Sequence, residues 1–139
     1  MKNDINNEVI THENPNEIPE GFYKNNTALK TIIIPDTVSK IGRNAFSGCT
    51  NLKNINLPKN LKIIDKGTFE NCTSLENIVI PNGVTKIEED AFLGCKNLEN
   101  FKIPESVVEI GESAFEGCLD KKLNKLIIPG TVKTIGVFL

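Results

Sequence analysis

The sequence predicts an α/β solenoid, a fold in which short repeats wind as parallel coils and stack on one another. Two observations predict it: an apolar residue followed by proline recurs at a nearly constant interval, and other apolar columns keep that interval. The dipeptides are Ile34-Pro35, Leu57-Pro58, Ile80-Pro81, Ile103-Pro104 and Ile128-Pro129, spaced by 23 residues except for the last step of 25. The repeat is therefore 23 residues long, with a two-residue insertion before its last copy.

Each repeat carries further positions that stay apolar or keep one residue type. Two columns precede the proline, namely Leu29, Leu52, Leu75, Leu98, Leu123 and Ile32, Ile55, Ile78, Phe101, Leu126. Two follow it, namely Val38, Leu61, Val84, Val107, Val132 and Ile41, Ile64, Ile87, Ile110, Ile135. The aromatic column is Tyr23, Phe46, Phe69, Phe92, Phe115, and the cysteine column is Cys49, Cys72, Cys95, Cys118. So many columns in one register indicate a single repeated structural unit.

One repeat predicts the elements of one coil. Residues 29–35 alternate as Leu-x-x-Ile-x-Ile-Pro and end at a proline that cannot continue a sheet ladder, so they predict a short strand. Val38 and Ile41 predict a second short strand or a turn. Ala45, Phe46 and Cys49 have the spacing of one helical face and predict a single helical turn. Because one such unit cannot bury its apolar surface alone, the coils must stack with like residues in files.

The chain divides into a polar segment and the solenoid. Residues 1–14 are polar and predicted to be disordered, whereas residues 15–139 form about five coils, the last of them incomplete. The first repeat is degenerate, with Pro15 where valine is expected and His12 where proline is expected. The insertion at residues 119–122 is charged and predicts a surface loop. The last repeat stops before Ala-Phe-x-x-Cys, which favours a piece of a longer array over a cap made by Phe138.

The complete pattern, Leu-x-x-Ile-x-Ile-Pro-x-x-Val-x-x-Ile-Gly-x-x-Ala-Phe-x-x-Cys, resembles the BspA-type leucine-rich repeat of bacterial and protozoan surface proteins. Residues 29–49 match every fixed position, and the resemblance spans residues 18–136. The departures are Asp65 and Glu88 at the glycine position and Thr68 at the alanine position. The resemblance implies a right-handed leucine-rich-repeat coil with short parallel strands on one face and single helical turns or short strands on the other.

The resemblance also implies a function and a location. Proteins of this type are associated with adhesion to host proteins and cells, which implies a cell-surface or secreted location. The polar N-terminus lacks the apolar stretch of a signal peptide, so the chain as written would instead be cytoplasmic. Function within the family follows the surface of each array, so adhesion is an expectation by analogy.

The composition limits the classes of partner. The chain has 16 Lys+Arg and 18 Asp+Glu, a net charge of −2, and neither sign forms a long block. This balance gives no electrostatic reason to expect nucleic acid. No apolar run approaches the ~20 residues that a membrane span requires, so membrane insertion is not expected.

The four cysteines are predicted to form a buried, reduced file. Zinc ligands lie close together in sequence, whereas these cysteines recur once per repeat. On neighbouring coils their Cα atoms could approach the ~4.4–6.8 Å of a disulfide, but the side chains of a file point the same way. A bridge or a metal is therefore the minor alternative.

No residue set predicts catalysis, a metal or a cofactor, so the chain is predicted not to be an enzyme. His12 lies in the degenerate N-terminal segment without a nucleophile or paired carboxylate at a meaningful spacing. The acidic run 88–90 precedes the predicted helical turn, where negative charge favours the helix dipole. Gly42, Gly111 and Gly136 repeat at a turn position and do not form a phosphate-binding loop.

The outward side chains of the first strand are the candidate binding face, because solenoids bind along such broad and rigid surfaces. The asparagines suit hydrogen bonding to a protein or a glycan, and three apolar residues stand where solvent favours polar ones. The competing interpretation is that β-branched residues simply suit strands. This strand face consists of Thr31, Ile33, Asn54, Asn56, Asn77, Val79, Asn100, Lys102, Lys125 and Ile127.

Two functions agree with these features. The first is a non-enzymatic module that binds a protein partner through the strand face. The alternative is a structural unit that associates with itself through its C-terminal coil or its sheet edge.

Overall fold

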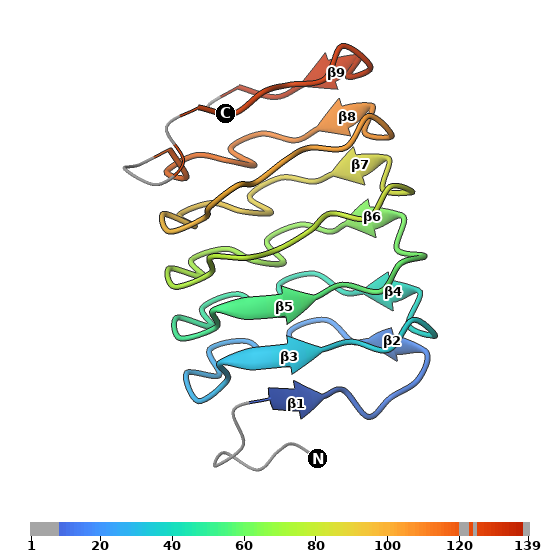
Figure 1. Cartoon of the computed structure of the whole chain (residues 1–139), viewed down its shortest axis with the longest axis vertical. Helices are drawn as coiled ribbons and strands as arrows, with labels where there is room; N and C mark the ends of the chain where they lie inside the picture. The colour runs from blue at the N-terminus through green and yellow to red at the C-terminus, as the bar shows by residue number, and fades with distance from the viewer. Residues whose placement is uncertain (1–8, 120–122, 124, 138–139) are drawn as a thin grey trace.

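The computed structural model describes residues 9–119, 123 and 125–137, and it shows a stack of parallel coils that rises from the N-terminal to the C-terminal end (Figure 1). The predicted solenoid is confirmed. We number its turns as coil 1 (residues 9–28), coil 2 (29–51), coil 3 (52–74), coil 4 (75–97), coil 5 (98–122) and coil 6 (123–137). The predictions for the insertion at 120–122 and for Phe138 concern residues outside this described part.

The first row of strands contains β1 (Val9–Thr11), β3 (Thr31–Ile33) and β5 (Asn54–Asn56), all parallel. In β3 and β5 the central isoleucine is buried and its neighbours face outward, as the alternation predicts. Beyond β5 the row continues only as an isolated bridge between Asn54 and Asn77. Among the described residues, the first row is thus a sheet in coils 1 to 3 and is not paired beyond that bridge in coils 4 to 6.

The second row is paired along nearly the whole stack (Figure 1). It contains a two-stranded sheet of β2 (Glu17–Ile18) and β4 (Lys40–Ile41), and a four-stranded parallel sheet. The four strands are β6 (Ile63–Ile64), β7 (Lys86–Ile87), β8 (Glu109–Ile110) and β9 (Thr134–Ile135). Each of these strands is two residues long, and its second residue is an isoleucine. These isoleucines stack from strand to strand and form a column that we call the isoleucine file.

The third side of each coil is a run of turns. The predicted single helical turn is wrong for the part of the chain that the structure describes, which contains no helix. In coil 2 the N–H of Cys49 donates to the carbonyl of Phe46 at 3.0 Å, an i to i+3 turn bond. Asn44 and Gly48 have φ angles of 56° and 76°, left-handed conformations that a right-handed helix cannot contain.

Alternate N–H groups of this run donate to the next coil instead. The N–H of Phe46 donates to the carbonyl of Thr68 at 2.9 Å, and the N–H of Phe69 donates to that of Ala91 at 2.9 Å. Hydrogen bonding between coils therefore replaces the i to i+4 bonds that a helical turn would have made. The spacing of Ala-Phe-x-x-Cys predicted the buried face correctly, because the turns also point these side chains inward.

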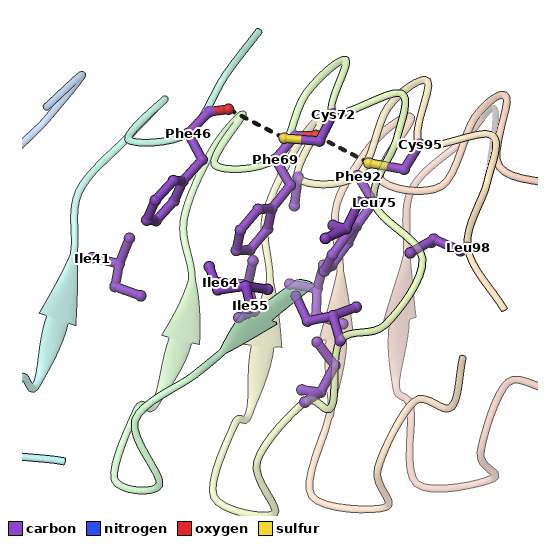
Figure 2. Packing of buried hydrophobic residues seen from close by; sticks show 14 of the residues in the cluster. Ile41, Phe46, Ile55, Ile64, Phe69, Cys72, Leu75, Phe92, Cys95 and Leu98 are labelled. Atoms are coloured by element: carbon purple, nitrogen blue, oxygen red, sulfur yellow. Dashed lines mark hydrogen bonds between the residues drawn. The ribbon is translucent and has the colours of Figure 1, made fainter. Parts of the chain in front are cut away.

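The core consists of files of like residues along the stack (Figure 2). The rings of the aromatic file stack at centroid distances of 5.2–5.6 Å with interplanar angles of 5–17°. The cysteine file is confirmed as buried, and all four thiols are free. Each thiol donates to a carbonyl of the preceding coil, as Cys72 does to Phe46 at 3.1 Å. The file members are Tyr23, Phe46, Phe69, Phe92, Phe115 and Cys49, Cys72, Cys95, Cys118.

Coil 1 begins earlier than its degenerate sequence indicated. The strand β1 lies inside the segment 1–14 that was expected to be disordered, while residues 1–8 lie outside the described part. Ile10 pairs with Ile32, a step of 22 residues, so His12 occupies the position equivalent to Ile34 and not that of the proline. His12 is buried, and its Nδ1 lies 2.7 Å from the hydroxyl of Tyr23.

Gly42 begins a turn, as predicted, because the N–H of Ala45 donates to its carbonyl at 3.2 Å. An added Cβ at Gly42 would lie 2.6 Å from the backbone nitrogen of Glu20 in the preceding coil, so the glycine column also permits close approach of coils. The prediction that the acidic run 88–90 begins a helical turn is wrong, because no helix starts there. Two of its carboxylates are paired with lysines, Glu88 with Lys86 at 3.4 Å and Glu89 with Lys66 at 2.8 Å.

Candidate functional site

The strand face is exposed along its whole length, as the alternation predicts. Thr31 and Asn54 are half-buried, and the other eight members are exposed, with Val79 reaching 80% and Ile127 reaching 70%. These two are among the most exposed large apolar side chains of the described residues. Two outward columns run along the stack: Thr31, Asn54, Asn77, Asn100, Lys125 and Ile33, Asn56, Val79, Lys102, Ile127.

The N-terminal part of this face is a regular sheet surface. Its asparagines form a partial ladder, because the side-chain amide of Asn77 donates to the side-chain oxygen of Asn54 at 2.9 Å. Lys53 lies 3.9 Å from Glu76 in the adjacent coil. The polar groups in this part are therefore partly engaged with one another.

The C-terminal part of the same face is hollowed into a groove of about 750 Å³. Buried core side chains form its floor, each of them 5–6% exposed, while the outward columns and the prolines form its walls. The groove crosses coils 4, 5 and 6. Its lining consists of Ile78, Val79, Ile80, Asn82, Asn100, Phe101, Lys102, Ile103, Pro104, Glu105, Lys125, Ile127 and Pro129.

The groove lies where the first row of strands loses its pairing, and we attribute both to Phe101. This ring occupies a position that Ile32, Ile55 and Ile78 hold in other coils. It packs against Phe92 and Phe115 at centroid distances of 5.2 and 5.4 Å, inclined by 64° and 59° to the stacked file.

The larger side chain requires room that the regular strand does not provide. The backbone turns immediately before it, because Asn100 has a φ of 51°, whereas a strand needs a negative φ. The structure records no hydrogen bond for the backbone groups of residues 101–103, all of which it describes.

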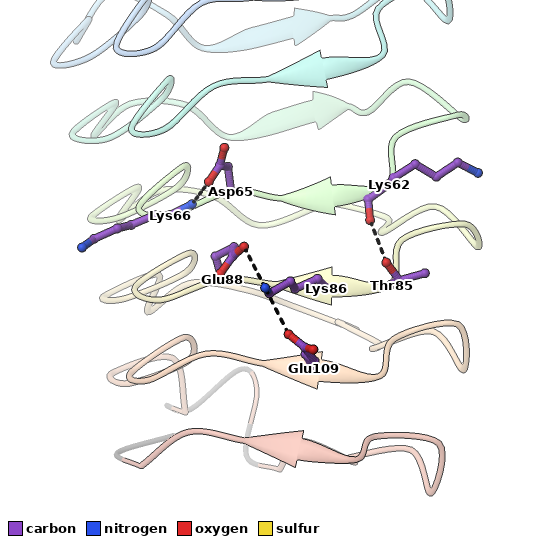
Figure 3. Close-up of polar contacts among 7 residues, drawn as sticks. All are labelled: Lys62, Asp65, Lys66, Thr85, Lys86, Glu88 and Glu109. Atoms are coloured by element: carbon purple, nitrogen blue, oxygen red, sulfur yellow. Dashed lines mark hydrogen bonds and ion pairs between the residues drawn. The ribbon is translucent and has the colours of Figure 1, made fainter.

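Two cations at the groove lack an acidic partner. Among the described residues, the structure records no ion pair for Lys102 or Lys125. Four other lysines of the described residues do have a carboxylate partner, namely Lys53, Lys59, Lys66 and Lys86. On the second row of strands Lys86 lies 3.4 Å from Glu88 and 3.1 Å from Glu109 (Figure 3), and these carboxylates raise the pKa of Lys86.

The buried thiols are poor nucleophiles. Burial raises the pKa of Cys49 to about 11 and that of Cys118 to about 12, and it also raises the pKa of Cys72 and Cys95. A thiol that stays protonated neither attacks an electrophile nor binds a metal readily. Groups of three or more His, Cys, Asp or Glu that could hold a metal ion do not occur among the described residues.

Sequence reasoning placed five groove residues on the candidate face and missed the groove itself. Its floor is made of residues assigned to the core, and a core column gives no sign that its members are reachable from outside. One signal was present, because Phe101 is the only aromatic residue in its column. The predicted members that line the groove are Val79, Asn100, Lys102, Lys125 and Ile127.

Comparison with known proteins identifies the repeat. The family model of the BspA type leucine rich repeat region matches residues 16–138 in 6 copies. The chain belongs to this family. The sequence had predicted about five coils, and the family model counts 6 copies.

Solved structures of bacterial leucine-rich repeat proteins have the same fold. A leucine-rich cell surface protein from Faecalibacterium prausnitzii is 31% identical with a TM-score of 0.77, covering 94% of this chain and 32% of that one. A leucine-rich repeat protein of T. pallidum is 31% identical with a TM-score of 0.75, covering 87% and 66%. One from Bacteroides ovatus is 27% identical with a TM-score of 0.76, covering 99% and 35%.

The chain spans about a third of the length of two of these neighbours and about two thirds of the other. No curated protein sequence matches it. Within the described residues, no helix has the length and apolar character needed to cross a membrane. Repeat arrays of this family generally serve as protein-interaction modules.

Proposed function

We propose that this BspA-type array is a non-enzymatic module that binds a protein through its strand face. The observation that carries the proposal is the groove of about 750 Å³ in coils 4 to 6, which has apolar core side chains as its floor on that face. Binding sites in proteins are typically concave, largely apolar and supplied with a few placed polar groups. The exposed Val79 and Ile127 on the walls extend the apolar surface outward.

The rest of the molecule supports this choice of surface. The second row of strands carries ion pairs, such as those of Lys86 with its two carboxylates, and its apolar side chains Ile63 and Ile135, at 42% and 46%, are less exposed than Val79 and Ile127. The strand face combines amide groups, apolar groups and unpaired cations on a rigid frame of stacked coils. Such a face can take a partner without the ordering cost that a mobile loop would add.

The test is selection of a phage-displayed random peptide library on the immobilised chain, followed by binding to matched variants. A face variant carries Ile33→Lys, Asn56→Lys and Val79→Lys, and a control variant carries Lys40→Glu in β4 on the second row. Selected peptides should bind the face variant at least about tenfold more weakly and the control as tightly as the parent chain. Equal binding to the face variant would overturn the proposal, provided that both variants keep the thermal midpoint of the parent.

Light scattering on the purified chain tests the alternative of self-association. A monomer at high concentration removes that alternative. An oligomer that the face variant dissociates would mean that the strand face binds a second copy of the chain instead of another protein.

A further inference from the structure

The arrangement of charge around the groove narrows the kind of partner that it fits. In one outward column Lys102 stands between Val79 and Ile127, so a cation is flanked on both sides by exposed apolar side chains. In the other column Lys125 follows Asn100. The groove thus offers two ammonium groups beside an apolar floor.

Neither ammonium group has a carboxylate within ion-pair distance in the described part of the chain, whereas Lys53, Lys59, Lys66 and Lys86 do. The chain as a whole carries a net charge of −2, so an unpaired pair of cations is a local reversal of the overall sign. One carboxylate, Glu105, lines the same groove. An unpaired cation beside apolar surface binds most favourably to an anion that has apolar groups next to it. Such a ligand removes the ion pair and the apolar surfaces from water in the same binding event.

We propose that the groove binds an extended peptide segment in which acidic residues alternate with apolar ones. The acidic side chains pair with Lys102 and Lys125, and the apolar ones pack over Phe101 and between Val79 and Ile127. This inference rests on the proposed function, because it names the partner of the same face.

The dimensions favour a short segment. The groove crosses three coils, which at ~4.8 Å per strand is about 10 Å along the stack. An extended chain rises by roughly 3.3 Å per residue, so three or four residues span the groove. Glu105 disfavours an acidic side chain near its own wall and limits the segment to few charges.

The probe is a fluorescein-labelled, acetylated peptide of sequence Val-Asp-Val-Asp-Val, with a matched Val-Asn-Val-Asn-Val peptide that has the same shape and no charge. Fluorescence anisotropy on the full chain should show binding of the first peptide at least about tenfold tighter than of the second. Raising the salt from about 50 mM to about 500 mM should weaken binding of the acidic peptide alone.

Charge-reversal variants test whether the two groove lysines cause the preference for the acidic peptide. The pair Lys102→Glu with Lys125→Glu should weaken the acidic peptide at least about tenfold and leave the amide peptide unchanged. The pair Lys24→Glu with Lys40→Glu, an equal charge reversal in coils 1 and 2, should change neither by more than about twofold. Equal binding of the two peptides, or equal losses in the groove and control variants, would overturn the inference.

The outcomes separate the inference from the proposed function. Library peptides that lose binding to the face variant yet tolerate both lysine reversals would refute the inference and leave the strand face as a protein-binding surface. Library peptides that ignore the face variant would refute the proposed function itself. Dodecanoate tests an anionic lipid as the alternative occupant of the groove. If the acidic peptide binds and dodecanoate does not displace it, the result supports a peptide occupant. If dodecanoate binds and the peptides do not, the inference is overturned in favour of an anionic lipid.

Discussion

The two halves of the first strand row have similar inward side chains and different backbones. In coils 1 to 3 the strands β1, β3 and β5 pair in register, whereas in coils 4 to 6 the row is reduced to one bridge and a groove opens. On the second row the opposite holds, since β6 to β9 pair continuously through the C-terminal half. Strand pairing in this solenoid is therefore decided locally on each side of the coil.

The difference shows that the stack does not depend on strand pairing in the first row, because the aromatic file continues from coil 1 to coil 5. Ring spacing stays between 5.2 and 5.6 Å through both halves, although pairing in the first row changes. Dispersion and apolar burial act at every coil, so losing a few hydrogen bonds on one side is tolerated. A binding groove can consequently form on a face without loss of the fold.

The largest expected effect is alkaline unfolding, which tests whether the two halves share one core. Burial holds the pKa of Cys49 at about 11 and that of Cys118 at about 12, against ~8.5 for an exposed thiol. Above pH ~8.5 the unfolded chain releases thiol protons that the folded chain keeps, so the free energy of unfolding falls as pH rises.

Each thiol contributes about 1.4 kcal/mol per pH unit within this window, so four thiols remove several kcal/mol by pH ~10.5. Circular dichroism against pH should show one transition, and all four cysteines should react with iodoacetamide together. Labelling of Cys95 and Cys118 well before Cys49 and Cys72 would mean that the C-terminal half opens by itself. A Cys49→Ala chain should lose stability less steeply with pH.

The second effect in size concerns the aromatic file. Phe69→Ala removes a fully buried ring stacked between Phe46 and Phe92, and we expect it to lower the free energy of unfolding by ~3–5 kcal/mol through cavity formation. Lys53→Ala, which removes an exposed partner of Glu76 at 3.9 Å, should change it by less than about 0.5 kcal/mol. Urea denaturation measures both, and effects of similar size would contradict the assignment of the aromatic file to the buried core.

The columns of the sequence were enough to predict the solenoid, its register and its core. Each buried isoleucine and phenylalanine repeats at one spacing, and stacking is the one way in which such short units bury them. The helical turn was predicted wrongly because one buried face, that of Ala45, Phe46 and Cys49, suits both a helix and a run of turns. Residues with left-handed backbone conformations, such as Asn44, distinguish a run of turns from a helix. The pattern of apolar residues gives no information about backbone handedness.

The site was predictable only in part. Period-two alternation placed Val79 and Lys102 on the outside, since that direction follows from the strand alone. The groove depends on how much room Phe101 takes between Phe92 and Phe115, which is a packing property of two coils at once. The register of His12 likewise depends on the pairing of β1 with β3, because one residue fewer in coil 1 shifts the expected position.

The smallest effect tests the cause assigned to the difference between the halves. If the Phe101 ring turns the backbone at Asn100, the amides of residues 101–103 should exchange with solvent more readily than those within β3 and β5. A hydrogen bond is worth roughly 1 kcal/mol net, which corresponds to about fivefold in exchange rate. Hydrogen exchange followed by mass spectrometry on overlapping peptides resolves a difference of this size.

Phe101→Ile returns the residue that Ile32, Ile55 and Ile78 hold in the same column. Protection of residues 101–103 should then rise toward that of β5, even though the variant loses ring contacts with Phe92. General stabilisation would not explain a rise in amide protection of residues 101–103 in a variant that has lost packing contacts. Such a rise therefore supports the Phe101 ring as the reason that the strands part. Exchange that is already slow in the parent chain, or unchanged by Phe101→Ile, would leave the ring as an occupant of the groove floor and remove it as the reason that the strands part.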